Sequence, residues 1–388
     1  MDFAFTPEQR AIREAVLALC AGFDADYWRE RDRSATFPED FHQAVAAAGW
    51  LGIAMPQGYG GAGLGMVEAA ILMQAISESG AGFSGASAVH MNIFGLNPVV
   101  VFGSDEQQRR WLPPLIRGEQ KACFAVTEPN AGLDTAKIAT SARREGERYV
   151  LRGQKIWTST AQVADKVLIL VRTGPPGAGN RPTDGLTLFY TDLDRRHVEV
   201  REIEKMGRAA VDSNMLFIDE LPVPVADRIG EEGRGFEYIL HGLNPERILI
   251  AAEAVGLGRA ALARAAAYAG ERVVFDRPIG QNQAIQHPLA RCWMELEAAD
   301  LMTFKAASLY DAGQPCGAEA NAAKYLAAEA GYRACEWAVL THGGMGYAKE
   351  YHVERYLREA MIPRLAPVSP QLILCFIAEK VLGLPKSY

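Results

Sequence analysis

The sequence predicts an α+β protein in which two helical regions flank a β region. Apolar residues recur at helical spacing near both ends of the chain, and short β-prone runs separated by turn residues lie between them. A chain of 388 residues also exceeds the size at which one hydrophobic core stops growing. We therefore expect a helical domain over residues 1–120, a β domain over 121–232 and a second helical domain over 233–388.

The expected N-terminal domain begins with a well-marked helix. Thr6-Pro7-Glu8 is typical of a capped helix start with proline in the first turn, and apolar residues then follow at three- and four-residue spacing to Cys20. Further helices are expected over residues 67–77 and over 105–115, where Ser104 is the candidate cap.

The pattern changes near Cys123 to short runs rich in β-branched and apolar residues. These runs predict strands over residues 149–151, 167–171, 186–190, 198–200 and 214–218. The stretch 174–183 is rich in glycine and proline, which indicates a loop. Strands at this spacing favour a compact antiparallel domain.

Helical spacing resumes after Gly233. One apolar face runs from Phe236 to Leu243, and an alanine-rich stretch follows over residues 251–268. Two further long helices are expected over residues 288–312 and 318–340. The order along the chain is therefore helical, β, helical.

Composition and charge argue against several classes of protein. The net charge of -7 gives no electrostatic reason to expect nucleic acid or an anionic membrane as partner. The apolar run at 372–378 is far too short for a membrane span. Charged residues near the N-terminus fit neither a secretory signal nor a transit peptide, so we expect a cytoplasmic protein. The six cysteines are scattered, and neither a metal site nor a disulfide framework is expected.

Two separated stretches carry the residues of a candidate flavin site. They are residues 126–134, Val-Thr-Glu-Pro-Asn-Ala-Gly-Leu-Asp, and residues 157–159, Trp-Thr-Ser. A flavin ring needs hydrogen-bond donors, a flat apolar wall, and glycine where the backbone approaches closely. Thr127 and Ser159 are the candidate donors. Trp157 is the candidate wall, and Gly132 permits the approach. Either stretch alone would instead favour a turn between strands, with the threonine and tryptophan packed in a core.

Together, at this spacing, the two stretches resemble the flavin-binding signature of the acyl-CoA dehydrogenase family, and the resemblance covers nearly the whole chain. Three further segments agree with it: residues 243–247, 272–283 and 342–347. The resemblance implies an N-terminal helical domain, a central antiparallel β-barrel and a C-terminal four-helix bundle. It also implies FAD as the cofactor and a homotetramer or homodimer as the assembly.

The resemblance further implies which residues contact FAD. They are Phe124, Val126, Thr127, Gly132, Leu133, Trp157, Ser159, Arg272, Phe275, Gln283, Leu340, Gly343, Gly344 and Ser369. Among them, the segment 272–283 would reach the FAD of a neighbouring subunit, and Gly343 and Gly344 would lie near the adenine of a neighbouring flavin. Taken singly, Arg272 is also consistent with a solvated cation at a helix end, and the two glycines with a helix C-cap.

Three positions depart from the family pattern. Leu133 stands where members usually have a serine beside the flavin pyrophosphate, and Leu340 stands where many have a glutamine. Asp276 replaces the common glycine after Phe275. Each change removes or alters a polar contact, so the flavin is expected to bind less tightly.

A fourth departure concerns the catalytic base. Many members use a glutamate near the C-terminus, but here Pro367 takes its place and cannot accept a proton. Relatives such as isovaleryl-CoA dehydrogenase carry the base on a helix just before an arginine, and Glu246 before Arg247 fits that arrangement. The chemistry needs a carboxylate of raised pKa in an apolar pocket. We expect Glu246 to be the base, with Glu253 on the same helix face as the reserve candidate.

The alternative for Glu246 is an ordinary carboxylate at a helix start. Asn244 would then be the cap, Pro245 would lie in the first turn, and Arg247 could form an ion pair. The resemblance instead assigns Leu133, Asn244 and Arg247 to the substrate.

The expected function is FAD-dependent α,β-dehydrogenation of an acyl-CoA thioester to the trans-2-enoyl-CoA, with electrons passed to an electron-transferring flavoprotein. Pro367 keeps open a flavin monooxygenase or oxidase on the same fold. The changes at Leu133, Leu340 and Asp276 keep open a non-catalytic flavin-binding relative. The length and branching of the acyl chain stay open.

Overall fold

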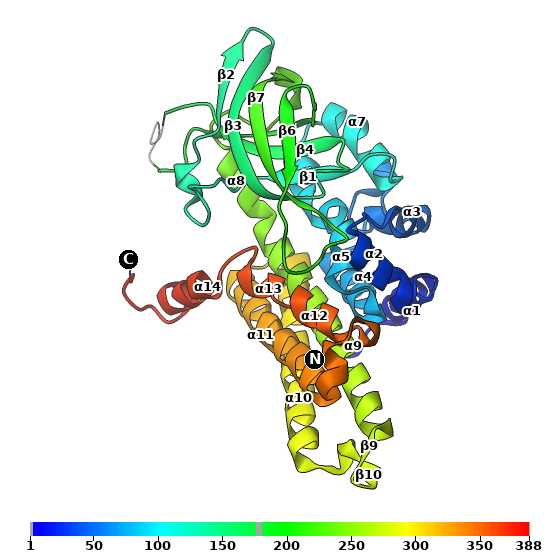
Figure 1. The fold of residues 1–388 in the computed structure, drawn as a ribbon. Helices are drawn as coiled ribbons and strands as arrows, with labels where there is room; N and C mark the ends of the chain where they lie inside the picture. Colours follow the sequence, from blue (N-terminus) through cyan, green and yellow to red (C-terminus); the bar gives the residue numbers. More distant parts are fainter. Residues whose placement is uncertain (1–2, 176–180, 388) are drawn as a thin grey trace.

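The computed structural model describes residues 3–175 and 181–387. The sheet lies at the top of the molecule in Figure 1, and long helices run below it. Along the chain the order is helical, sheet, helical, as the sequence predicts. Positions 176–180 of the loop expected over 174–183 lie outside the described residues.

The N-terminal region folds into helices joined by short 3₁₀ and π turns. They are α1 (Pro7–Cys20), α2 (Ala25–Ser34), α3 (Glu39–Ala47), η1 (Trp50–Gly52), η2 (Gln57–Tyr59), α4 (Met66–Ile76), η3 (Ser77–Ala81), α5 (Gly82–His90), η4 (Met91–Gly95), α6 (Asn97–Phe102) and α7 (Asp105–Ile116). The predicted cap of α1 is confirmed: Gln9 N–H donates to the Thr6 hydroxyl, and Thr6 N–H donates to the Gln9 side chain. Ser104 and Gln107 form the same reciprocal cap at α7.

The central region forms a mixed sheet with neighbouring strands in the order β6-β7-β3-β2-β4-β5-β8, and β1 pairs with β4 outside this path. The strands are β1 (Ala122–Ala125), β2 (Ser141–Glu145), β3 (Arg148–Ser159), β4 (Lys166–Arg172), β5 (Leu186–Asp192), β6 (Val198–Glu202), β7 (Ser213–Pro224) and β8 (Arg228–Ile229). The expectation of a purely antiparallel domain is wrong, because β1 and β2 both pair with β4 in parallel. Strands far apart in the chain can pair this way because the long connection between them allows a crossover. The sheet ends at β6 and β8, so the described strands do not close into a barrel.

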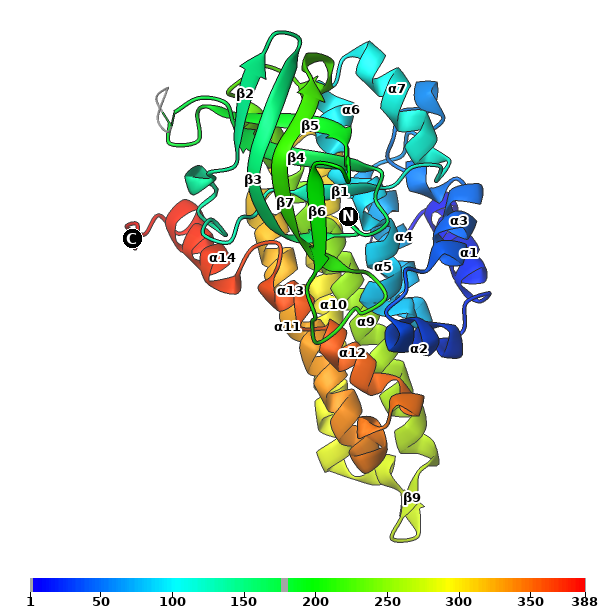
Figure 2. The ribbon, with the colours of Figure 1, turned by 45° about the horizontal axis from the view of Figure 1, so that its top comes forward.

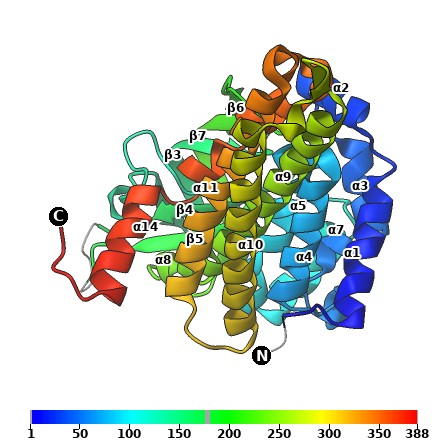
Figure 3. The same cartoon turned by 90° about the horizontal axis from the view of Figure 1, so that it is seen from below.

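The C-terminal region is helical again. Its elements are α8 (Gly235–His241), α9 (Leu243–Glu271), β9 (Val273–Val274), β10 (Arg277–Pro278), η7 (Ile279–Gln281), α10 (Gln283–Asp311), α11 (Gly317–His342), η8 (Gly343–Tyr347), η9 (Lys349–Tyr351), α12 (Val353–Glu359), α13 (Ile362–Leu365), α14 (Pro370–Phe376) and η10 (Ile377–Val381). Helices α9, α10 and α11 pack side by side, and α4 packs along α9 and α10 (Figure 3). The helices packed along α9 therefore come from two regions of the chain.

Helix α9 is fixed by close approach to both neighbours. A Cβ added at Gly256 would lie 2.4 Å from the carbonyl oxygen of Gln74 in α4. A Cβ added at Gly331 in α11 would lie 2.6 Å from the carbonyl oxygen of Ala254. Only glycine permits backbones to approach this closely, so these two contacts set the position of α9.

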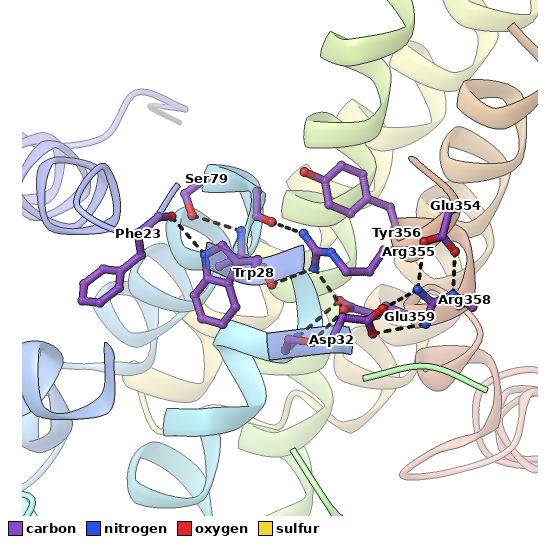
Figure 4. Close-up of polar contacts among 12 residues, drawn as sticks. Phe23, Trp28, Asp32, Ser79, Glu354, Arg355, Tyr356, Arg358 and Glu359 are labelled. Carbon is purple, nitrogen blue, oxygen red and sulfur yellow. Dashed lines mark hydrogen bonds and ion pairs between the residues drawn. The ribbon is translucent and has the colours of Figure 1, made fainter. Parts of the chain in front are cut away.

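Buried charges fasten α12 to the N-terminal helices (Figure 4). The guanidinium of Arg355 lies 3.0 Å from the Glu359 carboxylate and donates to the Gly80 carbonyl at 2.6 Å. Glu359 in turn accepts a hydrogen bond of 2.7 Å from the Ser84 hydroxyl in α5. Both partners of the ion pair are almost completely buried, so α5 and α12 share one desolvated polar junction.

The neighbouring Arg358 extends this junction to the sheet. It pairs with Asp32 in α2 at 2.6 Å and donates to the Met206 carbonyl at 3.2 Å. Met206 lies in the segment between β6 and β7, which descends from the sheet to the helical body (Figure 2). A hollow of about 330 Å³ beside this junction is lined by charged side chains of α2, η9 and α12. Helix α12 therefore holds a segment of the sheet region in place.

Two stretches, residues 66–102 and 353–381, are long and apolar enough to span a membrane by length and composition. The most apolar 18-residue window of the first is 76% buried inside the protein, as a core helix would be, and that of the second is 22% buried. The second is also divided among α12, α13, α14 and η10. The absence of a membrane span stays a prediction.

Replacing Arg355 by methionine should lower the free energy of unfolding by about 3–5 kcal/mol, because Glu359 would keep a buried and unpaired charge. Urea unfolding followed by circular dichroism measures the loss. Arg33→Met is the matched control, since its partner Glu30 lies at the surface, and it should cost less than about 1 kcal/mol. Similar losses in both variants would contradict the importance of the junction.

Candidate active site

The turn that carries Thr127 is held by a buried ion pair. Lys155 is fully buried, and its ammonium lies 2.9 Å from the Glu128 carboxylate and 3.1 Å from the Val126 carbonyl oxygen. Burial lowers the pKa of Lys155 to about 8. Glu128 also accepts two backbone N–H groups from the segment before β2. This pair fixes the backbone on both sides of Thr127, whose side chain is partly exposed.

Strand β3 is irregular where it carries Trp157. The register with β7 shifts between Lys155 and Thr158, and Trp157 has a left-handed φ of 60°. A bulge re-aims a side chain out of the strand alternation, and Trp157 is 56% exposed. The tryptophan therefore presents a flat face at the surface, which contradicts the alternative that it fills the core.

Gly132 and Leu133 lie at the surface beyond the Thr127 turn. A Cβ added at Gly132 would meet no described atom within 4 Å, so packing within the described chain does not require glycine there. The Leu133 side chain is 55% exposed. Phe124 and Val126 are partly buried against the core beneath the turn. The open space over Gly132 fits the close approach of a ligand.

Arg208 connects Ser159 to the helical body. Its guanidinium donates to the hydroxyl oxygens of Ser159 at 2.9 Å, Ser213 at 3.0 Å and Ser87 in α5 at 3.1 Å. Ser159 accepts here, so its own O–H is left to donate elsewhere. Sequence reasoning missed Arg208, because it lies in an irregular segment where no residue pattern marks it. The structure thus joins the predicted flavin stretch to α5.

Glu246 lies in the first turn of α9, and the residue as a whole is partly exposed. Protein surrounds the carboxyl closely enough that burial raises its pKa from 4.5 to about 7, although His90, Arg247 and Lys324 oppose the shift electrostatically. Ile248, two residues on, is fully buried. A carboxyl that is reachable and yet poorly hydrated has the character expected of a base.

The structure corrects the alternative interpretation of this helix start. The N-cap of α9 is Gly242, without a side-chain cap, and Asn244 lies inside the first turn. The Asn244 side chain instead accepts a hydrogen bond of 3.2 Å from Arg247, which also donates to the Leu243 carbonyl. Within the described residues no ion pair joins Arg247 to Glu246. Asn244 and Arg247 lie within one helical turn of Glu246, and their contact with the substrate stays a prediction.

The reserve candidate, Glu253, is fully buried. Its carboxylate lies 2.6 Å from Nδ1 of His90, the last residue of α5. Burial lowers the pKa of His90, but Glu253 and Glu246 together more than offset this, and the pKa is raised. Glu253 therefore lacks the access that Glu246 has, and its charge is already engaged by an imidazole.

The segment that would carry the usual family base is tied to α11. The ammonium of Lys324 is buried and donates to the Val368 carbonyl, next to Pro367, at 2.6 Å. Burial lowers the pKa of Lys324 to about 8. Ser369, a predicted FAD residue, caps α14 by accepting from Leu372 N–H. The cap leaves the Ser369 O–H available as a donor.

The remaining predicted FAD residues are not brought near Glu246. Arg272 and Gln283 lie on either side of the β9–β10 hairpin, and Phe275 lies in its turn, at the far lower end of the helical body (Figure 1). Phe275 is 94% exposed. Leu340, Gly343 and Gly344 lie exposed at the end of α11. The single chain therefore holds two separate groups of predicted FAD residues.

Three family models match the chain in succession. The N-terminal domain of acyl-CoA dehydrogenases matches residues 6–119, the middle domain residues 123–221, and the C-terminal domain residues 233–367. The chain belongs to the acyl-CoA dehydrogenase family. Acyl-CoA dehydrogenase FadE12 of Mycobacterium tuberculosis is 38% identical to it, over 100% of this chain and 99% of that protein.

Solved structures agree with this assignment. Butyryl-CoA dehydrogenase from Megasphaera elsdenii superposes with a TM-score of 0.93 at 28% identity, over 98% of this chain and 100% of that one. A chain solved in work on the electron transferring flavoprotein of Acidaminococcus fermentans gives a TM-score of 0.93 at 29% identity, with the same coverage. This dehydrogenase is an FAD-dependent oxidoreductase that acts on acyl-CoA thioesters.

Glu246→Gln should stabilise the protein at pH 8 and not at pH 5. The pKa of Glu246 is raised to about 7 in the folded chain, so the unfolded chain loses this proton at lower pH and wild-type stability falls as the pH rises from 4.5 to 7. The variant avoids that loss and should gain up to about 3 kcal/mol at pH 8. Thermal unfolding at both pH values measures it.

Glu271→Gln is the matched control, since Glu271 ends the same helix and is exposed. It should change the melting temperature little at either pH. A gain for Glu246→Gln that is equal at pH 5 and pH 8 would contradict the raised pKa.

Proposed function

We propose that Glu246 is the base that removes the α-proton of the acyl-CoA thioester. The observation that carries this is a carboxyl whose pKa burial raises to about 7, on a residue that is itself partly exposed. The usual alternative position holds Pro367, which has no proton acceptor in its side chain. Glu253, the other nearby carboxylate, is buried against His90. Of the three candidate positions, Glu246 is thus the one that best suits the role of the base.

A pKa near the working pH suits this role. A general base must be ionised to accept a proton, and it must bind that proton well enough to compete for it. With a pKa of about 7, a large fraction of Glu246 is ionised at neutral pH. The rate of α-proton removal should therefore rise with pH through about 7 and then level off.

The stretch around Thr127 fits the flavin ring of FAD. Thr127 and Ser159 would donate hydrogen bonds, the exposed face of Trp157 would cover the ring, and the open space at Gly132 would admit it. FAD, when bound, supplies the acceptor for the β-hydrogen and its electron pair. With the α-proton on Glu246, the product is the trans-2-enoyl-CoA.

Three residues are proposed to contact the substrate. Asn244 and Arg247 lie within one turn of Glu246 and are hydrogen-bonded to each other, so they form a polar rim beside the base. The positive charge of Arg247 also helps to keep Glu246 ionised. Leu133 would add an apolar contact from the sheet side.

We also propose a homotetramer or homodimer that completes the FAD site. Large apolar side chains are exposed on the β9–β10 hairpin and the long helices: Val273, Val274, Phe275, Trp293, Met294, Leu301, Leu326 and Leu340. Exposed apolar surface of this extent marks an interface between proteins. In the assembly, the segment 272–283 and residues 340–344 would reach the FAD of a neighbouring subunit.

The electron acceptor is proposed to be an electron-transferring flavoprotein. The similarity to the chain solved in work on the Acidaminococcus fermentans flavoprotein supports this choice. We also propose a cytoplasmic location, which the charged residues near the N-terminus support. The Glu246-Arg247 pair supports membership of the subgroup that carries the base on this helix.

The base assignment predicts that Glu246→Gln slows reduction of bound FAD by on the order of 10²–10⁴-fold. Anaerobic stopped-flow mixing with a panel of acyl-CoA thioesters, followed by flavin bleaching, measures this rate. Glu271→Gln should reduce flavin at the wild-type rate. Bleaching undiminished in Glu246→Gln would remove this residue from the role.

Because Pro367 cannot act as a base, a flavin monooxygenase or oxidase is the alternative function. The same purified protein can be used to test it. Rapid reoxidation of the dithionite-reduced protein by air would favour that alternative over transfer to a flavoprotein. A colourless protein that takes up no FAD would favour a non-catalytic member.

The assembly proposal predicts that Phe275→Asp dissociates the oligomer and lowers its FAD content, because a charge would replace an exposed apolar side chain at the interface. Size-exclusion chromatography with light scattering gives the mass, and flavin absorbance gives the occupancy. Phe3→Asp is the matched control, since Phe3 is 71% exposed and lies outside the proposed interface. Unchanged mass and FAD content in Phe275→Asp would contradict the proposal.

A further inference from the structure

A buried imidazole–carboxylate pair lies under the candidate base and has no part in the reaction proposed above. His90 ends α5, and Glu253 lies seven positions after Glu246 on α9. A seven-residue step is about two helical turns, so both carboxyls face the same side of α9, about 10 Å apart along its axis. The Nδ1 atom of His90 lies 2.6 Å from Glu253.

Stability alone does not account for this pair. Glu253 is fully buried and His90 nearly so, and the desolvation of two buried charges can cancel the attraction between them. The second carboxylate oxygen of Glu253 also has no hydrogen-bond partner within the described part of the chain. The fold thus keeps the Glu253 carboxylate buried where α5 contacts α9, although its burial is energetically unfavourable.

We infer that the His90–Glu253 pair is a positioning unit that keeps a protonated imidazole near Glu246 and so lowers the pH at which Glu246 ionises; this rests on the proposed role of Glu246. Glu253 keeps the imidazole protonated by accepting its Nδ1–H. The protonated ring favours the carboxylate form of Glu246. His90 and Glu253 touch neither substrate nor flavin in this arrangement.

Charges from each packed element support the direction of the effect. The charges that act on the pKa of Glu246 come from His90 in α5, Arg247 and Glu253 in α9, and Lys324 in α11. Among the cations, His90 has the largest effect on Glu246, and it exceeds the opposing effect of Glu253. His90 itself faces the two carboxylates and Arg208. Removing the pair as a unit should therefore raise the pH at which Glu246 ionises.

Infrared titration tests this without turnover. The protonated-carboxyl band of Glu246 is identified by subtracting the spectrum of Glu246→Gln, and its midpoint is measured in wild type, His90→Gln and the double variant His90→Gln/Glu253→Gln. The double variant keeps two polar side chains at the contact and leaves no unpaired buried charge. His90→Gln should shift the midpoint upward by about one pH unit, and the double variant should shift it upward by less, because it also removes the opposing charge of Glu253.

The pH profile of anaerobic flavin reduction gives a second readout. In His90→Gln its acid limb should move upward by the same amount, with a rate at pH 6 lower by on the order of tenfold and an unchanged plateau at high pH. His42→Gln is the matched control: His42 is also buried, and burial lowers its pKa to about 4, so its loss removes no charge at neutral pH. It should leave both readouts unchanged.

The outcomes separate this inference from the proposed function. An infrared midpoint that moves by less than about 0.3 pH units in both variants overturns the positioning role, whatever the enzyme does with substrate. Flavin reduction by Glu246→Gln at the wild-type rate overturns the proposal that Glu246 is the base. The infrared titration still decides whether the His90–Glu253 pair changes the pKa of Glu246. Equal shifts in His42→Gln would also overturn the inference, because the effect would not be specific to the pair.

Discussion

The position of helix α9 is the constraint on which the rest of the structure depends. Glycines at 256 and 331 bring its backbone into contact with α4 and α11, where any Cβ would collide with a carbonyl oxygen. The same helix carries Glu246 in its first turn and Glu253 two turns later. A shift of α9 would break its contacts with α4 and α11. These contacts therefore fix the positions along α9 of the residues that carry the two carboxyls.

Charge placement follows from that constraint. A base must be desolvated to hold its proton and must still ionise near neutral pH, and these requirements oppose each other. Burial raises the pKa of Glu246, while cations from α5, α9 and α11 oppose the rise. Arg208 then ties α5 to Ser159 on the sheet. One chain of contacts therefore runs from the predicted flavin stretch to the helix that carries the base.

The sequence predicts the helical–sheet–helical order well, because caps such as Thr6 and Ser104 and the spacing of apolar residues are local signals. It does not predict the parallel pairing of β4 with β1 and β2, since register between distant strands leaves no local pattern. The motif around Thr127 and the Glu246-Arg247 pair mark the candidate site. The sequence does not reveal the roles of Arg208 and of the Glu128–Lys155 ion pair, because their partners come together only in the folded chain.

A crystal structure of the FAD-loaded protein with a non-reactive acyl-CoA analogue tests the central claim most directly. We expect the carboxylate of Glu246 about 3–3.5 Å from the α-carbon of the thioester, on the side opposite the flavin ring. A thioester bound with its α-carbon far from residue 246, or facing another proton acceptor, would contradict the account.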